Sequence, residues 1–264
     1  MPFPIARRVI YKTNPLERVI CQLRYPPILR IEAEIPANFQ DRIRAEFPNY
    51  SETSEIKLEL PPAIQGAIPP ELASQMFQST GSKNYEFSSE DGLWKINLTR
   101  TFIALTTSKY ERWEHFRDKL ELPLQALVEF YAPSHFSRVG LRYVDVIKRS
   151  ILNLRGVDWR ELLQPYVLGI SASNEVGSQV KAFEIRHDVG LSDGESIVRI
   201  IMRLAETPDT GEPCYVIDSD FYNTSKIQIP DAKDKLDFLS ARGTRLFQWC
   251  ITERLHNAMG PQPL

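Results

Sequence analysis

Apolar and polar residues alternate along five segments of this chain, which is the pattern of strands that bury one face. The strongest alternation covers residues 135–150, HFSRVGLRYVDVIKRS, and an earlier one covers residues 18–25, RVICQLRY. Residues 181–191, 196–206 and 214–222 alternate in the same way. We predict one strand in each segment, because successive side chains of a strand point to opposite faces.

Two longer segments carry apolar residues at spacings of three and four, which predicts helices with one buried face. The first covers about residues 109–131, and Pro123 is predicted to kink or restart it. The second covers about residues 231–258. A shorter helix is predicted over residues 37–47, and another after Asp158, whose side chain can cap it.

Residues 84–108 are predicted to form one hairpin. The pair Asp91-Gly92, a strong turn signal, separates the run NYEFSS from the run LWKINLTRTFIALTTS. We treat the second run as a single strand, and its apolar face then carries Trp94, Ile96, Leu98, Phe102 and Ala104. Residues 56–60, IKLEL, are a further strand candidate, and they run into a proline-rich loop at 61–70.

The order of these elements predicts an α+β fold. Each half of the chain places a strand and a short helix before two or three strands and a long helix. Because hairpins dominate and helices follow them, we expect a continuous, curved antiparallel sheet backed by the two long helices. We expect a single domain over residues 1–264, with similar halves at about 16–133 and 134–260 and an N-terminal arm at 1–15.

The charge balance excludes one broad class of protein. The chain has 32 Lys and Arg against 34 Asp and Glu among its 264 residues, so its net charge is −2. A globally basic nucleic-acid-binding protein is therefore excluded, although a local basic face is compatible with this balance.

The sequence also lacks the motifs of several common sites. It has no GxGxxG, GxxxxGK[ST], HExxH or CxxC pattern, so we expect no cofactor and no metal ion. The three cysteines, Cys21, Cys214 and Cys250, are too few and too far apart for a disulfide framework. No segment has the length and apolarity of a secretory signal or a membrane span. We therefore expect a cytoplasmic location and no membrane partner.

Four stretches resemble one family of sporadically distributed prokaryotic proteins. Residues 14–27, NPLERVICQLRYPP, resemble its opening motif, and residues 139–147, VGLRYVDVI, resemble its central strand. Residues 216–222, VIDSDFY, and the helix around 238–252 are similar to its last strand and last helix. The family carries a histidine near the start of that helix, whereas this chain has none at 239–243. The resemblance implies a prokaryotic setting, with a mobile or defence-related system as the expected context, and it brings no activity.

Asp218 and Asp220 are the candidate catalytic carboxylates. They stand two residues apart and therefore share one face of a predicted strand. Such a pair could bind Mg²⁺ for phosphoryl transfer or nuclease chemistry. Alternatively, the pair could form ion pairs with arginines of a neighbouring strand, for which Arg199 and Arg203 have the matching parity.

Arginine and tyrosine residues recur on the predicted strands. Such a face can stack bases and hold phosphates, or it can be neutralised by the carboxylates of Glu184, Asp188, Asp145 and Asp218. We name five residues as candidates for binding a ligand or partner: Arg24, Arg142, Tyr143, Arg199 and Arg203.

These observations favour a recognition or accessory protein without a catalytic site. Its partner is expected to be another protein, which binds the open face of the sheet or the proline-rich loop 61–70. Two alternatives remain: a Mg²⁺-dependent enzyme that uses Asp218 and Asp220, and a protein that binds RNA or a nucleotide through the arginine and tyrosine face. The sequence leaves the oligomeric state open.

Overall fold

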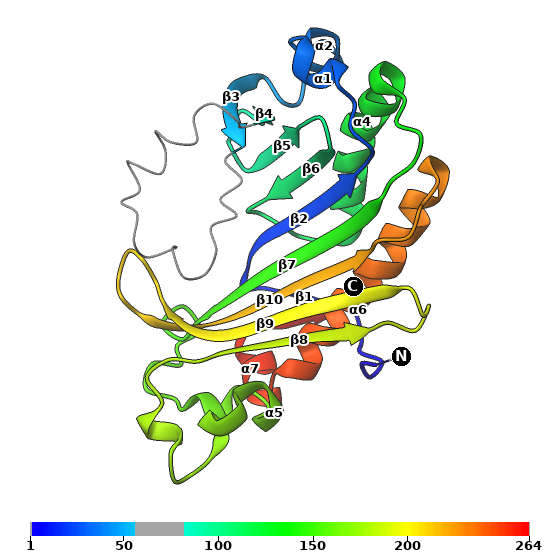
Figure 1. The fold of residues 1–264 in the computed structure, drawn as a ribbon. Helices are drawn as coiled ribbons and strands as arrows, with labels where there is room; N and C mark the ends of the chain where they lie inside the picture. Colours follow the sequence, from blue (N-terminus) through cyan, green and yellow to red (C-terminus); the bar gives the residue numbers. More distant parts are fainter. Residues whose placement is uncertain (1, 56–81, 264) are drawn as a thin grey trace, which may run out of the picture.

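A nine-stranded antiparallel sheet is the centre of the computed structural model, which describes residues 2–55 and 82–263 (Figure 1). The strands lie in the order β3-β4-β5-β6-β2-β7-β10-β9-β8. In chain order these strands are β2 (Leu16–Arg24), β3 (Asn49–Glu55), β4 (Ser82–Ser88), β5 (Trp94–Leu98), β6 (Phe102–Thr107), β7 (Arg138–Lys148), β8 (Glu184–Gly190), β9 (Ser196–Glu206) and β10 (Pro213–Asn223). The predicted α+β class with a continuous antiparallel sheet is confirmed.

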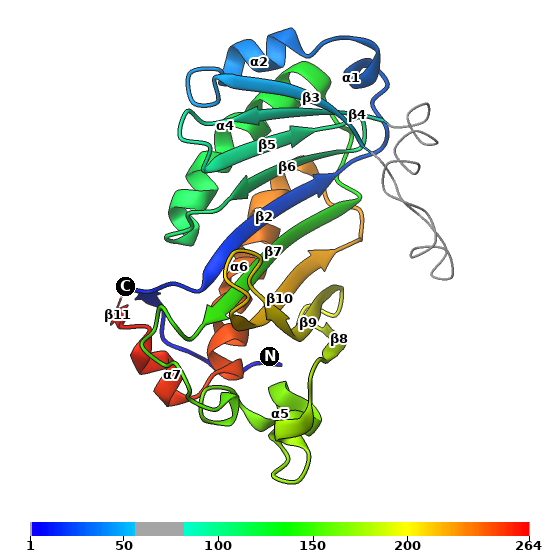
Figure 2. The ribbon, with the colours of Figure 1, turned by 90° about the vertical axis from the view of Figure 1, so that its left-hand side faces the viewer.

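The two halves of the chain meet where β2 pairs with β7. In this register Cys21 lies opposite Leu141, and Leu23 lies opposite Val139. All four residues are fully buried, so the junction is part of the core. Figure 2 shows the result, in which the strands of both halves follow one another without a break.

Two long helices, α4 (Trp113–Tyr131) and α6 (Ala232–Cys250), cover one face of the sheet (Figure 2). They also contact each other, because the indole of Trp113 donates a hydrogen bond of 2.5 Å to the Asp237 carboxylate. The same carboxylate accepts a hydrogen bond from Arg117 at 3.1 Å. The core fills the space between these helices and the sheet. No helix of the described residues covers the other face, which we call the open face.

Shorter elements close the ends of the sheet. The N-terminal strand β1 (Val9–Tyr11) pairs with β11 (Pro261–Pro263), so the first and last described segments lie side by side. The remaining α-helices of the described residues are α1 (Arg30–Ala33), α2 (Ala37–Ile43), α5 (Pro165–Leu168) and α7 (Glu253–Ala258). The helix predicted over residues 37–47 is therefore shorter than expected. The segment after Asp158 forms a 3-10 turn, and the Asp158 side chain caps it as predicted.

The prediction of one long strand in the hairpin was wrong, because the chain turns between β5 and β6. The Thr99 hydroxyl accepts hydrogen bonds from the backbone N–H groups of Thr101 and Phe102, and these bonds stabilise the turn. The turn reverses the chain and changes the parity of the residues that follow. Ile103 and Leu105 therefore face the helices with Leu98, whereas Phe102 faces away.

The predicted helices also differ in detail from those observed. Helix α4 continues through Pro123 without restarting. The last helix ends at Cys250, because Ile251 is extended and pairs with Leu163, and Thr252 then caps α7. The predicted strand at 56–60 and the loop at 61–70 lie outside the described residues.

Candidate functional site

Ion pairs between neighbouring strands cross the open face. Arg142 of β7 binds the Asp218 carboxylate of β10 with Nε–Oδ1 and Nη2–Oδ2 distances of 2.7 and 2.5 Å. One row along, Nη2 of Arg138 lies 2.8 Å from both carboxylate oxygens of Asp220. These bonds raise the pKa of Arg142 above its ordinary value, because the Asp218 carboxylate stabilises the charged guanidinium.

The expected partners of these two aspartates were wrong. Arg199 lies opposite Asp220 in the β9–β10 register, yet its guanidinium binds Asp188 of β8 at 2.8 and 2.9 Å. Arg203 likewise turns to Glu184 of β8, at a distance of 3.6 Å. The Arg199 guanidinium lowers the pKa of Asp188 below its ordinary value. Both arginines of β9 therefore bind carboxylates of β8 and not the aspartates of β10.

Among the described residues, no group of three or more His, Cys, Asp or Glu side chains could hold a metal ion. Asp218 and Asp220 are instead the acceptors of the two arginine pairs described above. A Mg²⁺ ion at this place would have to displace Arg142 and Arg138 from their carboxylates. The arrangement therefore favours the ion-pair interpretation of the Asp218–Asp220 motif.

A hollow of about 720 Å³ lies on the open face, over the strands at the junction of the two halves. We call it the sheet hollow. Its polar and boundary residues are Leu16, Glu17, Arg18, Ser108, Arg142, Arg203 and Asp218, and its apolar floor consists of Ile20, Val144, Val146 and Val216. These four apolar side chains point to the open face. Most of the other side chains on this face of the same strands are arginines and carboxylates.

Arg18 differs from the other two arginines of the sheet hollow. Arg142 pairs with Asp218, and Arg203 pairs with Glu184. Arg18 is exposed and has no carboxylate partner within residues 2–55 and 82–263. The hollow therefore combines an apolar floor with one guanidinium that is available to a ligand.

Two residues assigned to the open face by the sequence interpretation lie on the opposite face. Tyr143 packs under α6 with 8% of its surface exposed, so it is not on the same face as Arg142. Asp145 is also buried on the helix side and cannot neutralise the arginines of the open face directly. Both corrections follow from strand alternation, since residues 143 and 145 share the parity of the core residues Leu141 and Ile147.

Of the five candidate residues, the structure brings only Arg142 and Arg203 to the sheet hollow. Arg24 lies at the end of β2, where it donates to Gln22 and stands 6.0 Å from the ring centroid of Phe102. Arg199 lies on the same face but does not line the hollow. The sequence interpretation missed the four floor residues. Their signal was an apolar side chain at a strand position where its neighbours in the sheet are charged.

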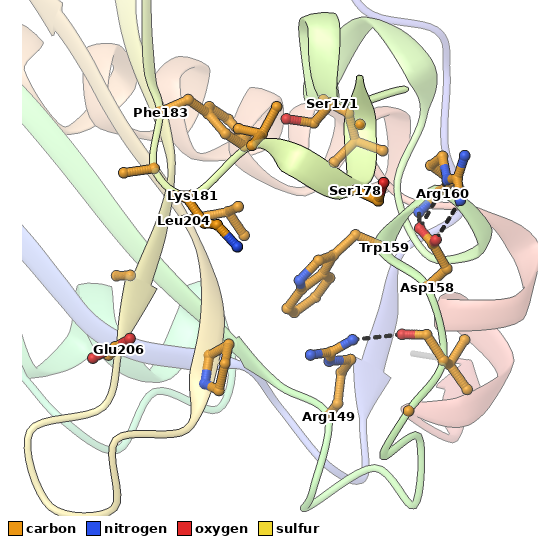
Figure 3. A pocket seen from close by; sticks show the side chains of 18 residues that line it. Arg149, Asp158, Trp159, Arg160, Ser171, Ser178, Lys181, Phe183, Leu204 and Glu206 are labelled. Carbon is orange, nitrogen blue, oxygen red and sulfur yellow. Dashed lines mark hydrogen bonds and ion pairs between the residues drawn. The ribbon is translucent and has the colours of Figure 1, made fainter. Parts of the chain in front are cut away.

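A second hollow, of about 740 Å³, lies beside the sheet between β9, β10 and the connection from β7 to β8 (Figure 3). The side chains of Trp159, Phe183 and Leu204 point toward it. Arg149 stacks on Trp159, with 4.4 Å between the guanidinium carbon and the ring centroid, and donates to the Val157 carbonyl at 2.6 Å. This arginine is therefore engaged in holding the wall of the hollow.

Comparison with known families and with curated proteins finds no match for this chain. In the part of the chain that the structure describes, no helix is both long and apolar enough to cross a membrane.

Proposed function

We propose that this protein is a recognition protein without catalytic activity, and that it binds an extended segment of a partner protein in the sheet hollow. The observation that carries this proposal is the apolar floor of Ile20, Val144, Val146 and Val216 on a face that is otherwise charged. A partner that covers these floor residues removes their apolar surface from water, which favours binding by about 25 cal/mol per Å² of apolar surface. The family resemblance adds an accessory role in a prokaryotic system to the proposal.

The charges at the hollow define the chemistry of the partner. Its lining carries three arginines (Arg18, Arg142 and Arg203) and two carboxylates (Glu17 and Asp218), which leaves an excess of one positive charge around the apolar floor. Of these three arginines, Arg18 is the one without an ion pair to any described residue. The partner segment accordingly carries apolar side chains for the floor and a carboxylate for Arg18.

The state of the other arginines favours a protein over a nucleic acid. Arg138, Arg142 and Arg199 all form short pairs with carboxylates of neighbouring strands. A phosphate backbone would have to compete with these carboxylates and would meet their negative charge. Stacked bases would also need exposed aromatic rings, whereas Tyr143 is buried on the other face.

Selection of displayed peptides tests this proposal without knowledge of the natural partner. A random twelve-residue library is selected on the immobilised protein, and the enriched peptides are measured against three variants. Val146→Glu places a charge on the floor, Arg18→Glu reverses the free guanidinium, and Val176→Glu changes an exposed residue away from the sheet.

We expect selected peptides to combine apolar and acidic residues and to lose at least about tenfold in affinity with Val146→Glu, about 1.4 kcal/mol. Arg18→Glu should weaken the acidic peptides, and Val176→Glu should have no effect. Peptides that bind all three variants equally would contradict the proposal. Single-stranded RNA that binds tightly, with a steep dependence on salt, would support the alternative.

A further inference from the structure

A small cavity lies on the other side of the sheet, beneath helix α6. Its volume is about 80 Å³. Strand β1 closes one side with Val9–Tyr11, and α6 closes another with Gly243, Thr244 and Phe247. The exposed residues Asn14 and Glu111 form its outer part. We call this space the Asp145 cavity, because Asp145 of β7 stands at its buried end.

The Asp145 side chain is the most unusual feature of this cavity. Only 6% of the residue is exposed, and its carboxyl group makes no hydrogen bond or ion pair with any residue in 2–55 or 82–263. Among the described residues, no lysine, arginine or histidine lines the cavity. A buried carboxyl group without a partner costs several kcal/mol in general, and native proteins rarely keep one without a use.

Two further polar groups of the cavity lining have no hydrogen-bond partner in the described part of the chain. The hydroxyls of Ser219 and Thr244 line the cavity and make no hydrogen bond within the described segments. Together with the Asp145 carboxyl group they provide three acceptor sites. A ligand that presents several N–H donors matches this set, because an alkylammonium group has up to three of them.

Aromatic rings surround these acceptors in two pairs. Tyr11 and Phe247 lie with ring centroids 5.9 Å apart, and Tyr110 and Tyr143 lie at the same distance. All four residues line the cavity. Ring faces attract cations within about 6 Å, and cages of such rings are a common way to bind ammonium groups.

The surroundings of the carboxyl group favour its protonated form. Burial, and to a smaller extent the negative charge of Asp218 on the open face, raises the pKa of Asp145 to about 8. The ionisable groups that face it from the described elements packed around it are Tyr11, Tyr110, Glu111, Tyr143 and Cys250, and none of these is a cation. A bound cation would therefore replace the proton that the carboxyl group otherwise keeps near neutral pH.

We propose that the Asp145 cavity binds a small alkylammonium ion, with its ammonium group at the Asp145 carboxylate and its carbon atoms against the four rings. A cavity of 150 Å³ can hold benzene, so about 80 Å³ suits roughly three or four non-hydrogen atoms. A metal ion is the less suitable occupant, because no cluster of three ligating side chains occurs among the described residues.

The same chemistry could come from a free amine or from the end of a lysine side chain. Chemical-shift titration of the ¹⁵N-labelled protein in an amine-free buffer, at constant ionic strength, distinguishes the two. The probes are propylammonium chloride, its neutral counterpart propan-1-ol, and Nα-acetyl-lysine amide. We expect propylammonium to bind with a Kd of roughly 0.1–10 mM, given its four non-hydrogen atoms, and propan-1-ol to bind at least about tenfold more weakly.

Variants assign the effect to the cavity. Asp145→Asn should weaken propylammonium binding at least about tenfold, whereas Glu111→Gln at the outer part should change it less than about threefold. Phe247→Leu keeps an apolar side chain, although a smaller one, and removes one ring, and it provides a second test should Asp145→Asn fold poorly. Binding of the lysine amide as well as propylammonium would assign the site to a lysine side chain, and binding of propylammonium alone would assign it to a free amine.

Two results would overturn the proposal. One is the absence of shift changes at Gly243, Thr244 and Ser219 with up to about 50 mM propylammonium, which is beyond the expected Kd range. The other is an equal loss of affinity in Asp145→Asn and Glu111→Gln, which would indicate attraction to negative charge in general.

Discussion

Gly243 of α6 lies directly on the ring of Tyr143, so closely that a Cβ atom at Gly243 would stand 2.7 Å from Cε2 of the tyrosine. Glycine within a helix normally costs about 1 kcal/mol relative to alanine. Here the contact with Tyr143 reverses that preference, because the ring is buried in the core and has little room to move.

We predict that Gly243→Ala lowers the free energy of unfolding by about 1–3 kcal/mol. Denaturant titration followed by circular dichroism measures this loss. Gly190→Ala in β8 is the matched control, since its added Cβ would meet no atom within 4 Å. An increase in stability for Gly243→Ala would show that the helix does not press on Tyr143 as described.

Asp145 should give the protein a characteristic dependence on pH. Its pKa is about 8 in the folded chain, against about 3.9 for an unperturbed aspartate in the unfolded chain. Between these values the folded protein binds more protons than the unfolded protein, so stability decreases as pH rises. Above pH 8 the folded protein bears the full free-energy cost of burying an ionised carboxylate. Below pH 4 this cost disappears, because the group is protonated in both states.

The variant Asp145→Asn removes this titration. We predict that it becomes more stable relative to the wild type as pH rises from 4 to 8, by more than about 1 kcal/mol over the range. Thermal unfolding at several pH values measures the difference. Parallel pH profiles for the two proteins would contradict the raised pKa of Asp145.

The pair of Arg142 and Asp218 should contribute only modestly to stability. The arginine side chain is 46% exposed, although the aspartate side chain is 13% exposed. We predict a coupling of about 0.5–1.5 kcal/mol in a double-mutant cycle with Arg142→Met and Asp218→Asn, and a smaller coupling in 1 M NaCl. A coupling above about 3 kcal/mol would mean that this face is not open to solvent.

The three cysteine thiols should be unreactive in the folded protein. Cys21, Cys214 and Cys250 are buried, and burial raises the pKa of Cys21 to about 12. Because the thiolate is the reactive form, we predict that Ellman's reagent at pH 8 modifies all three only after unfolding. Rapid modification of Cys214 in native buffer would show that the end of β10 opens.

Strand alternation made much of the fold predictable. The apolar parity of residues 135–150 correctly placed Leu141 and Ile147 in the core, and the two apolar stripes located α4 and α6. The turn between β5 and β6 was not predictable in the same way. It has no Gly, Pro or Asn, and depends on the hydroxyl of Thr99, which bonds to the backbone of residues 101 and 102.

The site was less predictable than the fold, because it depends on which strands are neighbours. Strand alternation allows Asp220 and Arg199 to lie on the same face of the sheet. Only the strand order shows that Arg138 is available to Asp220, and Asp188 to Arg199. Asp145 did carry a signal. It is a carboxylate among the apolar residues that form the buried face of the strand predicted over 135–150. Such a position indicates a buried ionisable group rather than part of a polar face.

The central claim is that the sheet hollow binds a protein segment, and cross-linking from its floor tests this most directly. A photo-reactive amino acid is placed at Val146 on the floor or at Val128, an exposed residue of α4. Each protein is expressed in its native host and irradiated. We expect a discrete adduct from position 146 that protease degrades, that nuclease leaves intact, and that Arg18→Glu abolishes. An adduct of equal yield from position 128, or one that nuclease destroys, would contradict the claim.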